Sequence, residues 1–449
     1  MLPDYITKAV PVPAEKRTSW YASTAPSYAG VFLWVAFYQA IAVGTVNRAS
    51  LWICMLAIVA AGLLCYALYY YVPAMLGMKT GYPLYVVGSS TFGTLGGYVM
   101  PGLLMGLLQV GWFAVGTYFS TLYILSGFRT EARPRTLLFG IVAVLWGYAM
   151  AYVGVKGIRY VARVALYLNA IALLMILVVF LKTAGGLSRH VPADPAPFVA
   201  VTLLMQMIIG FFATAGAAGA DFGMNNRNAR DVRLGGLVGI AGAVAYAGGL
   251  PLLSVAGAHG LHPELAGYTY DAVIGAIGGW LASAMFFLFA IASVAPACFC
   301  AFIAGNSFAT MIPSVPRAAS LMTGVTVAIV LAVTGAAQNL IGFFTIVGAS
   351  FGPICGAMAA DYLLSGKRWA GPREGINWAG YGAWALGFVV GILPFLPVSP
   401  EWKTRIQPAV VYSFLVGFLA YAALAKAGLQ PRVVPLNPSA GKPQKRARG

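Results

Sequence analysis

Charge is the scarcest property of this sequence. Of its 449 residues, only 9% are charged and 60% are hydrophobic. A soluble globular protein carries about 25% charged residues, so this composition excludes a protein that lives in water. The mean hydropathy of +0.82 indicates a polytopic membrane protein.

Histidine and cysteine are also scarce. The three histidines fall in expected loops, and the acidic residues nearest to helices, Asp221 and Asp361, fall at expected helix ends. An intramembrane enzyme needs a nucleophile with a base, or a cluster of His and carboxylates, within its helices. The five cysteines lie in apolar segments without CxxC or zinc-like spacing. We therefore expect no enzyme, no cofactor, no disulfide framework and no metal cluster.

The net charge of +17 does not indicate nucleic-acid binding, because the basic residues are scattered over short loops. They predict the orientation instead. With the N-terminus inside, the inner loops and both tails hold 20 Lys and Arg, and the outer loops hold 8. The positive-inside rule then places both termini in the cytoplasm of a multi-pass inner (plasma) membrane protein.

Twelve apolar segments are long enough to cross a bilayer, which takes about 20 helical residues for a core of ~30 Å. We expect an all-α polytopic membrane protein with twelve transmembrane helices. Their expected spans are 27–46, 51–73, 97–125, 136–154, 161–182, 198–222, 234–258, 276–310, 318–335, 339–364, 376–397 and 407–426.

Two polar side chains interrupt the third apolar segment, in the stretch "LLQVGWFAVG". Gln109 and Trp112 are three residues apart and so share one helical face. An amide beside an indole offers hydrogen bonds and a flat stacking surface. Taken alone, the pair is equally consistent with a Gln that bonds a neighbouring helix and a Trp that fills the core.

The sixth segment, "GFFATAGAAGADFGMNN", is rich in Gly and Ala. Such a stretch allows close helix packing. The alternative is a locally unwound helix, which is tolerated at membrane depth where its backbone is buried in protein or lines a cavity. Phe212 and Thr214 would then flank that cavity.

The first and eighth segments carry further polar features. "FLWVAFYQAIAVG" holds Gln39 at mid-depth, and "FAIASVAPACFCAFIAGNSF" holds Ser293 and Pro296. Pro296 lacks a backbone donor and frees an acceptor one turn earlier. A hard cation such as sodium takes several oxygens, but a mid-helix Ser is more often bonded to its own helix.

Segments one and six are five apart and both look interruptible. This pattern indicates a transporter of two inverted repeats with its site near the bilayer midplane. We expect a cytoplasmic tail at 1–26, a first repeat of helices 1–5 at 27–183 and a second repeat of helices 6–10 at 198–364. Two extra helices follow at 376–426, and the basic tail at 427–449 is expected to be disordered and to lie near anionic lipid headgroups.

Several motifs resemble the nucleobase cation symporter family of purine and cytosine permease type. They are "QVGWFAVG" at 109–116, "GAAGADFG" at 216–223, "GPICGAMAADYLLSGKR" at 352–368 and "GINWAGYGAWALG" at 375–387. The resemblance extends from helix 1 to helix 11. It implies the five-plus-five inverted-repeat fold of the amino acid, polyamine and cation transporter superfamily, and inward carriage of a nucleobase-like heterocycle with sodium or protons.

The resemblance also implies roles for individual residues. Trp112 would stack on one face of a planar base while Gln109 bonds its edge. Phe212 would cover the opposite face, Thr214 would stand near the base, and Gln39 would lie beside it. For sodium, the family uses main-chain carbonyls that correspond here to Val35 and Tyr38.

The family's sodium site also uses two adjacent hydroxyl residues on helix 8, which read Ala292 and Ser293 here. Its cytosine carriers continue with Asn-Asp-Asn, where this chain has Val294, Ala295 and Pro296. One sodium hydroxyl and three polar groups are therefore missing, and both sodium and proton coupling stay open.

The sequence thus predicts a secondary active transporter that imports a nucleobase or related planar heterocycle by alternating access. The alternatives are a carrier of another small metabolite on the same fold, such as a hydantoin, a vitamin precursor or an amino acid, and a non-transporting membrane sensor. We expect no soluble signalling domain among these residues, which disfavours the sensor. The expected partners are the substrate and membrane lipid.

Overall fold

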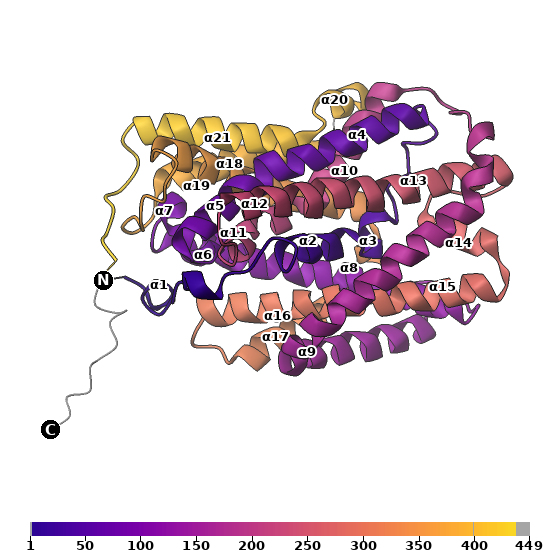
Figure 1. Ribbon diagram of the computed structural model, residues 1–449, viewed down its shortest axis with the longest axis horizontal. Helices are drawn as coiled ribbons and strands as arrows, with labels where there is room; N and C mark the ends of the chain where they lie inside the picture. Colours follow the sequence, from indigo (N-terminus) through magenta and orange to yellow (C-terminus); the bar gives the residue numbers. More distant parts are fainter. Residues whose placement is uncertain (1, 398, 437–449) are drawn as a thin grey trace.

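The computed structural model describes residues 2–397 and 399–436, with all side chains in this range except those of 155–164, 166 and 400. Every regular element in the described range is a helix, and β pairing is confined to two isolated bridges. Most of the long helices run along the long axis of the molecule (Figure 1).

The helices follow one another closely along the chain. They are α1 (Asp4–Thr7), α2 (Thr24–Phe32), α3 (Val35–Tyr38), α4 (Leu51–Leu64), α5 (Tyr71–Thr80), α6 (Leu84–Val87), α7 (Ser89–Phe92), α8 (Leu104–Gly127), α9 (Leu137–Thr183), α10 (Pro197–Ala217), α11 (Gly219–Gly223), α12 (Ala229–Gly236), α13 (Ala243–Leu261), α14 (Tyr270–Ile277), α15 (Gly279–Ala292), α16 (Val294–Met311), α17 (Arg317–Val333), α18 (Leu340–Leu364), α19 (Trp378–Ile392), α20 (Pro400–Arg405) and α21 (Ala409–Lys426). Short π-helical turns join α4 to α5 (Cys65–Tyr70), precede α8 (Val99–Leu103) and join α12 to α13 (Leu237–Gly242).

Ten helical spans within the described residues are long and apolar enough to cross a membrane. The other two expected crossings are the first, which is broken into α2 and α3, and the ninth, which corresponds to the shorter apolar helix α17. The expected polytopic, all-α fold is confirmed. The exact number of twelve crossings stays a prediction, because the broken first segment and the short helix α17 do not reach the length of the other spans.

Helices 1 and 6 are both interrupted, as expected. α2 ends at Phe32 and α3 begins at Val35, with Trp34 between them in extended backbone (φ −74°, ψ 130°). α10 continues regularly through Gly210 and Gly216 to Ala217, and α11 begins at Gly219. The break in helix 6 is thus confined to Ala218 and does not extend over the whole glycine-rich stretch.

Other helix boundaries differ from the sequence-based spans. The fourth and fifth segments join into one helix, α9. Its N-terminal and C-terminal halves run in different directions in Figure 1. The eighth segment is divided at Ser293 into α15 and α16, and the separate short helix α14 precedes it. The second segment extends through Thr80, where Gly81 closes α5 in the left-handed conformation (φ 75°) that glycine adopts without strain.

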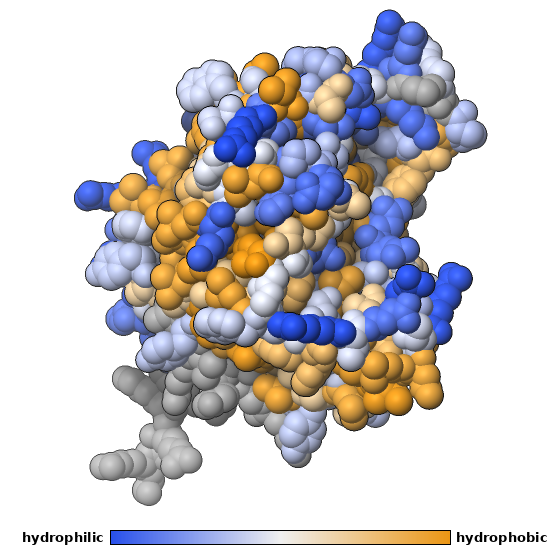
Figure 2. Space-filling model, turned by 90° about the vertical axis from the view of Figure 1, so that its right-hand side faces the viewer, coloured by the Kyte–Doolittle hydropathy of each residue, from blue (hydrophilic) through white to orange (hydrophobic). Residues whose placement is uncertain are grey.

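Both ends of the described chain lie at the same end of the bundle, on the left of Figure 1, and α14 lies at the opposite end. Figure 2 looks onto the α14 end and shows hydrophilic residues spread across it, with hydrophobic residues along its sides. At the other end, Leu436 packs against a small core that contains Tyr5 and Ile6. The described parts of the two terminal segments are therefore close together.

The tail predicted at 427–449 is not disordered over its first residues. Arg432 pairs with Glu374 at 2.6 Å, Val433 forms a β bridge with Arg373, and Gln430 accepts a hydrogen bond from Arg373 at 3.3 Å. Residues 437–449, including the basic cluster expected near lipid headgroups, lie outside the described residues.

A buried ion pair ties these segments together at the end that carries the termini. Arg373 donates to Asp361 at 2.9 Å, and their side chains are 7% and 5% exposed. Asp361, near the end of α18, also accepts hydrogen bonds from Ser90 at 2.7 Å and Thr91 at 3.2 Å on α7. One carboxylate thus connects α18, α7 and the loop before α19.

Replacing Asp361 with Asn should destabilise the protein strongly, because Arg373 keeps its charge in a buried place without a counter-ion. Breaking a buried pair from one side costs about 3–5 kcal/mol. The change is measured as a lower Tm of the purified protein in detergent. The matched control is Glu374→Gln, which breaks the exposed pair with Arg432 and should leave Tm nearly unchanged. Equal Tm values for the two variants would contradict this role of Asp361.

Candidate substrate site

Trp112 lies in the middle of α8 and is buried, with 4% of its surface exposed. Its indole Nε1 donates a hydrogen bond to Oγ1 of Thr214 on α10 at 3.1 Å. The structure therefore brings together two of the residues that the sequence singled out, across a separation of 102 positions. The bond also fixes the orientation of the indole, because a Trp N–H can donate but not accept.

Aromatic rings surround Trp112 on several sides. Phe211 of α10 and Phe343 of α18 meet it edge to face, with ring centroids at 4.9 and 4.8 Å. Phe344 and Trp34 lie at 5.7 Å in tilted arrangements. These rings come from α8, α10, α18 and the break in helix 1. Together they form an aromatic box, which we define as Trp34, Trp112, Phe211, Phe343 and Phe344.

Phe212 does not belong to the aromatic box. Its ring stacks on Phe32 of α2, with centroids 5.4 Å apart and an interplanar angle of 15°, and it lies 5.6 Å from Tyr28. Consecutive residues of an α-helix point about 100° apart, so Phe211 and Phe212 cannot both face Trp112. In this structure Phe211 is the ring of that pair that contacts Trp112. The proposed role of Phe212 opposite Trp112 stays a prediction that requires a different rotation of α10.

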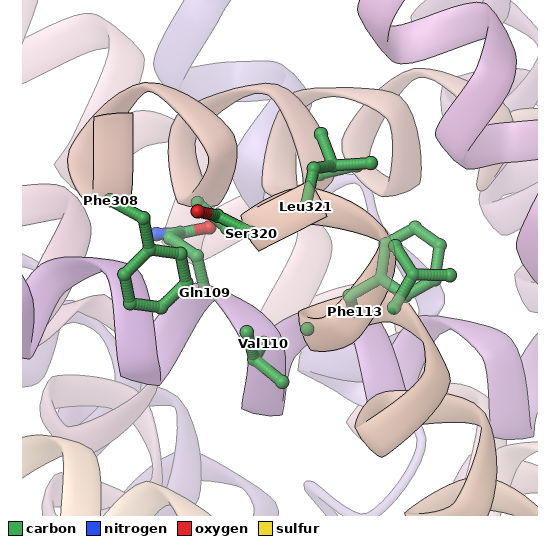
Figure 3. A pocket seen from close by; sticks show the side chains of 10 residues that line it. Gln109, Val110, Phe113, Phe308, Ser320 and Leu321 are labelled. Carbon is green, nitrogen blue, oxygen red and sulfur yellow. The ribbon is translucent and has the colours of Figure 1, made fainter. Parts of the chain in front are cut away.

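Gln109 lies one turn before Trp112 but faces a different set of helices. Its amide Nε2 is 3.7 Å from the sulfur of Met105. The side chain lines a small cavity between α8, α16 and α17, where it points toward Ser320 and lies beside Phe308 (Figure 3). The other residues that line this cavity are Val110, Phe113, Ala301, Ala304, Leu321, Gly324 and Val325. Gln109 and Trp112 thus lie on one face of α8, but Gln109 contacts the cavity beside α16 and α17, whereas Trp112 contacts the aromatic box.

Gln39 is engaged by other protein groups at both ends of its amide. Its Oε1 accepts from the hydroxyl of Tyr123 on α8 at 2.7 Å, and its Nε2 donates to Asp271 on α14 at 2.5 Å. Its backbone carbonyl accepts from the N–H of Tyr270 at 3.0 Å. We call these four residues the Gln39 network. It connects the broken helix 1 with α8 and α14.

The three oxygens assigned to a sodium site already form hydrogen bonds within their own segments. The carbonyl of Val35 accepts from Gln39 N at 2.9 Å, and that of Tyr38 accepts from Ile41 N at 3.3 Å. The Ser293 hydroxyl donates to the carbonyl of Phe289 at 3.0 Å. All three oxygens keep a free lone pair, but three are fewer than a hard cation normally takes. The described residues also contain no group of three His, Cys, Asp or Glu fit for a metal.

Several residues of this region were not selected from the sequence. Trp34 and Phe211 lie in the stretches that define the breaks, but a run of aromatic residues does not show which ring faces the site. Asp271 lies in a loop-like stretch, "GYTYDAV", and no local pattern indicates that it reaches helix 1. Phe343 and Phe344 look like ordinary residues of an apolar helix. Their places follow from packing alone.

Comparisons with known proteins place the chain in a family. The sequence model for permeases of cytosine and purines, uracil, thiamine and allantoin matches residues 11–417. The cytosine permeases of Escherichia coli strain K12 and of Escherichia coli O157:H7 are each 27% identical over 358 residues, which cover 78% of both chains.

Solved transporter structures share the fold. The inward-facing form of Mhp1 matches with a TM-score of 0.69 and 16% identity, covering 96% of this chain and 95% of Mhp1. A closed form of Mhp1, a nucleobase-cation-symport-1 family transporter with bromovinylhydantoin bound, matches with a TM-score of 0.65 and 18% identity over 98% of both chains. A sodium-coupled sialic acid symporter matches with a TM-score of 0.58 and 12% identity, covering 96% of this chain and 93% of the symporter.

The family model matches most of the chain, and the breaks in helices 1 and 6 and the shared fold agree with this match. The chain belongs to the family of permeases for cytosine and purines, uracil, thiamine and allantoin.

Proposed function

We propose that this protein is a secondary active transporter that imports a nucleobase or a related planar heterocycle together with a cation. The observation that carries the proposal is the place of Trp112. It is buried at the level of two helix breaks, is oriented by Thr214 and is surrounded by other rings. A nucleobase has an apolar face and a polar edge, and stacking it on an aromatic side chain contributes about 1–3 kcal/mol.

The aromatic box is closed on itself in this conformation. Phe211 and Phe343 touch Trp112 edge to face, so a heterocycle can stack on Trp112 only after one of these rings moves aside. Phe211 belongs to α10 and Phe343 to α18. Substrate entry therefore requires a rotation of one of these side chains or a shift of α10 or α18 relative to α8. Such a shift fits alternating access, in which one set of helices rocks against another around the site.

The driving force is the inward movement of a cation. One charge that moves inward through ~100 mV releases about 2.3 kcal/mol, which supports roughly fifty-fold accumulation at 1.36 kcal/mol per tenfold. Sodium and proton remain two candidates for this cation. The incomplete oxygen set at Val35, Tyr38 and Ser293 weakens the case for sodium without removing it.

The proposed orientation places both termini in the cytoplasm of the inner membrane. The described N- and C-terminal segments lie at one end of the bundle (Figure 1), and the excess of Lys and Arg falls in the loops of that end and in the tails. The end that carries α14 is then the outer end, and the Gln39 network lies on the outer side of the break in helix 1.

Transport by the purified protein in liposomes tests the proposal directly. Labelled cytosine, uracil, adenine, hypoxanthine and hydantoins are offered under a sodium gradient and, separately, under a proton gradient. We expect saturable uptake of at least one heterocycle, driven by one of the two gradients and absent from empty liposomes. Folded protein that takes up none of them under either gradient would overturn the proposal.

Replacing Trp112 with Ala should weaken uptake of the transported heterocycle, because the stacking surface is lost. A loss of about 1–3 kcal/mol of stacking corresponds to roughly five- to 150-fold in kcat/KM at 1.36 kcal/mol per tenfold. The control is Trp52→Ala, since Trp52 on α4 is 71% exposed. Equal kcat/KM for wild type and Trp112→Ala, with both proteins folded, would exclude Trp112 from the site.

Replacing Asp271 with Ala should loosen the outer end, because Gln39 loses the acceptor that ties helix 1 to α14. A cysteine placed at Ala36, which is fully buried on the inner side of Gln39, reports this opening through its reaction with an impermeant thiol reagent added outside. An unpaired buried group costs about 1–3 kcal/mol, so the labelling rate should rise roughly fivefold or more.

The five native cysteines are buried and give the background for this measurement. The matched control is Glu264→Ala, which removes an exposed carboxylate that pairs with His262 at 3.2 Å in the segment between α13 and α14. Its labelling rate should equal that of the parent. The same labelling rate in Asp271→Ala as in the parent would show that the Gln39 network does not hold the outer end closed.

A further inference from the structure

We infer that Trp34 is a specificity-determining residue, whose indole N–H donates a hydrogen bond to an acceptor on the edge of the transported heterocycle. The inference rests on the proposed function and assigns a role that neither the motifs nor the family match indicates. It implies that the substrate carries a ring carbonyl at the edge that faces helix 1.

Trp34 occupies the break in helix 1. Its backbone is extended, between the end of α2 at Phe32 and the start of α3 at Val35. Its ring lies 5.7 Å from that of Trp112, with an interplanar angle of 49°. A substrate stacked on Trp112 would therefore have Trp34 as a neighbour. Trp34 is the member of the aromatic box that helix 1 contributes, and it comes from the non-helical part of that helix.

The indole N–H of Trp34 is buried and has no hydrogen-bond partner among the described residues. The whole residue is 5% exposed. Buried donors of this kind are rare in folded proteins, and each one calls for an explanation. The N–H of the neighbouring Trp112 is already bonded to Thr214. Of these two adjacent indoles, Trp34 is therefore the one with a donor available to a ligand.

A second unpaired polar group lies near Trp34 on α8. The indole edge of Trp34 packs against Gly116, where an added Cβ would be 2.8 Å from its Cζ2 atom. Ser120 follows Gly116 by one helical turn on the same face. Its hydroxyl is buried and has no partner among the described residues. A group that can donate or accept thus lies one helical turn beyond the place where Trp34 contacts α8.

The chemistry of these groups defines the ligand edge. A Trp N–H can only donate, so its partner must be an acceptor, whereas the Ser hydroxyl can pair with either kind of group. Both a ring carbonyl and an unprotonated ring nitrogen are acceptors in the plane of the heterocycle. We assign the carbonyl, because its oxygen projects beyond the ring edge toward a donor that sits beside the stacked ring. A site built around buried hydrogen-bonding groups rejects analogues that leave those groups unpaired. The expected substrates are therefore oxo-substituted heterocycles rather than the same rings without the carbonyl.

The test compares pairs of heterocycles that differ in one carbonyl: hypoxanthine with purine, uracil with 4-pyrimidinone, and cytosine with 4-aminopyrimidine. Uptake of each labelled compound into liposomes is measured for wild type and for Trp34→Phe. The substitution keeps a ring beside Trp112 and Gly116 and removes the N–H. In each pair the first compound has one carbonyl more than the second, and we call it the carbonyl member. We expect wild type to prefer the carbonyl member of at least one pair.

In Trp34→Phe, kcat/KM for that carbonyl member should fall roughly five- to 150-fold, the range expected when a buried acceptor loses its donor. The member without the carbonyl should change little, so the preference collapses. Trp146→Phe is the matched control. It removes another buried indole N–H that is unpaired in the described structure, but on α9, and it should leave the preference intact.

The outcomes separate this inference from the proposed function. If wild type carries none of these six compounds, no adenine and none of the hydantoins, the proposed function fails. If wild type carries some of them without preferring a carbonyl member, or if Trp34→Phe keeps the full preference, the inference fails and the transporter assignment stands. If Trp34→Phe does not fold, Gly116→Ala serves instead, because the added methyl displaces the indole. An unchanged preference in that variant would equally overturn the role of Trp34.

Discussion

The rest of this structure depends on how the backbone is satisfied where a helix stops inside the membrane. Unpaired N–H and C=O groups are costly in a bilayer, and breaks are tolerated where protein groups or a cavity surround them. At the break in helix 1, the carbonyl of Trp34 accepts from Phe37 N at 2.9 Å, and that of Leu33 lies 3.4 Å from the hydroxyl of Tyr38. Near the break in helix 6, the carbonyl of Ala215 accepts from Tyr28 at 3.0 Å. Donors of helix 1 therefore serve carbonyls at both breaks.

The aromatic box follows from these breaks. A break releases side chains from the regular helical arrangement, and Trp34 uses this freedom to lie beside Trp112. α8 is a long, continuous helix that carries Trp112, Gly116 and Ser120 along one face. The hydrogen bond from Trp112 to Thr214 then links α8 to α10. A change in the position of α10 would thus change the orientation of the Trp112 ring, which is proposed to stack on the substrate.

Polar networks hold the two ends of the bundle in different ways. At the end with the termini, Asp361 and Arg373 form a buried pair with several further hydrogen bonds, and they connect α7, α18 and the loop before α19. At the α14 end, the Gln39 network relies on two side-chain hydrogen bonds to one amide and one backbone bond. The first network is suited to a permanent joint. The second consists of fewer bonds, which suits the opening proposed for the α14 end.

The sequence alone determined that this is a membrane protein, where most of its membrane segments lie, which two helices can be interrupted, and the family. These features depend on composition, hydropathy and local motifs, which a linear sequence records. Trp112 and Thr214 were both selected for the substrate site through the resemblance, and the structure joins them by a hydrogen bond, while their roles beside a substrate stay predictions. What the sequence did not determine was which of two adjacent rings, Phe211 or Phe212, faces Trp112, or that Gln39 bonds Asp271. Tertiary structure decided these points, since the rotation of a helix about its axis and the partner of a buried polar group depend on packing between segments far apart in the chain. The unpaired N–H of Trp34 became visible for the same reason: a donor is known to lack a partner only when all its neighbours are in place.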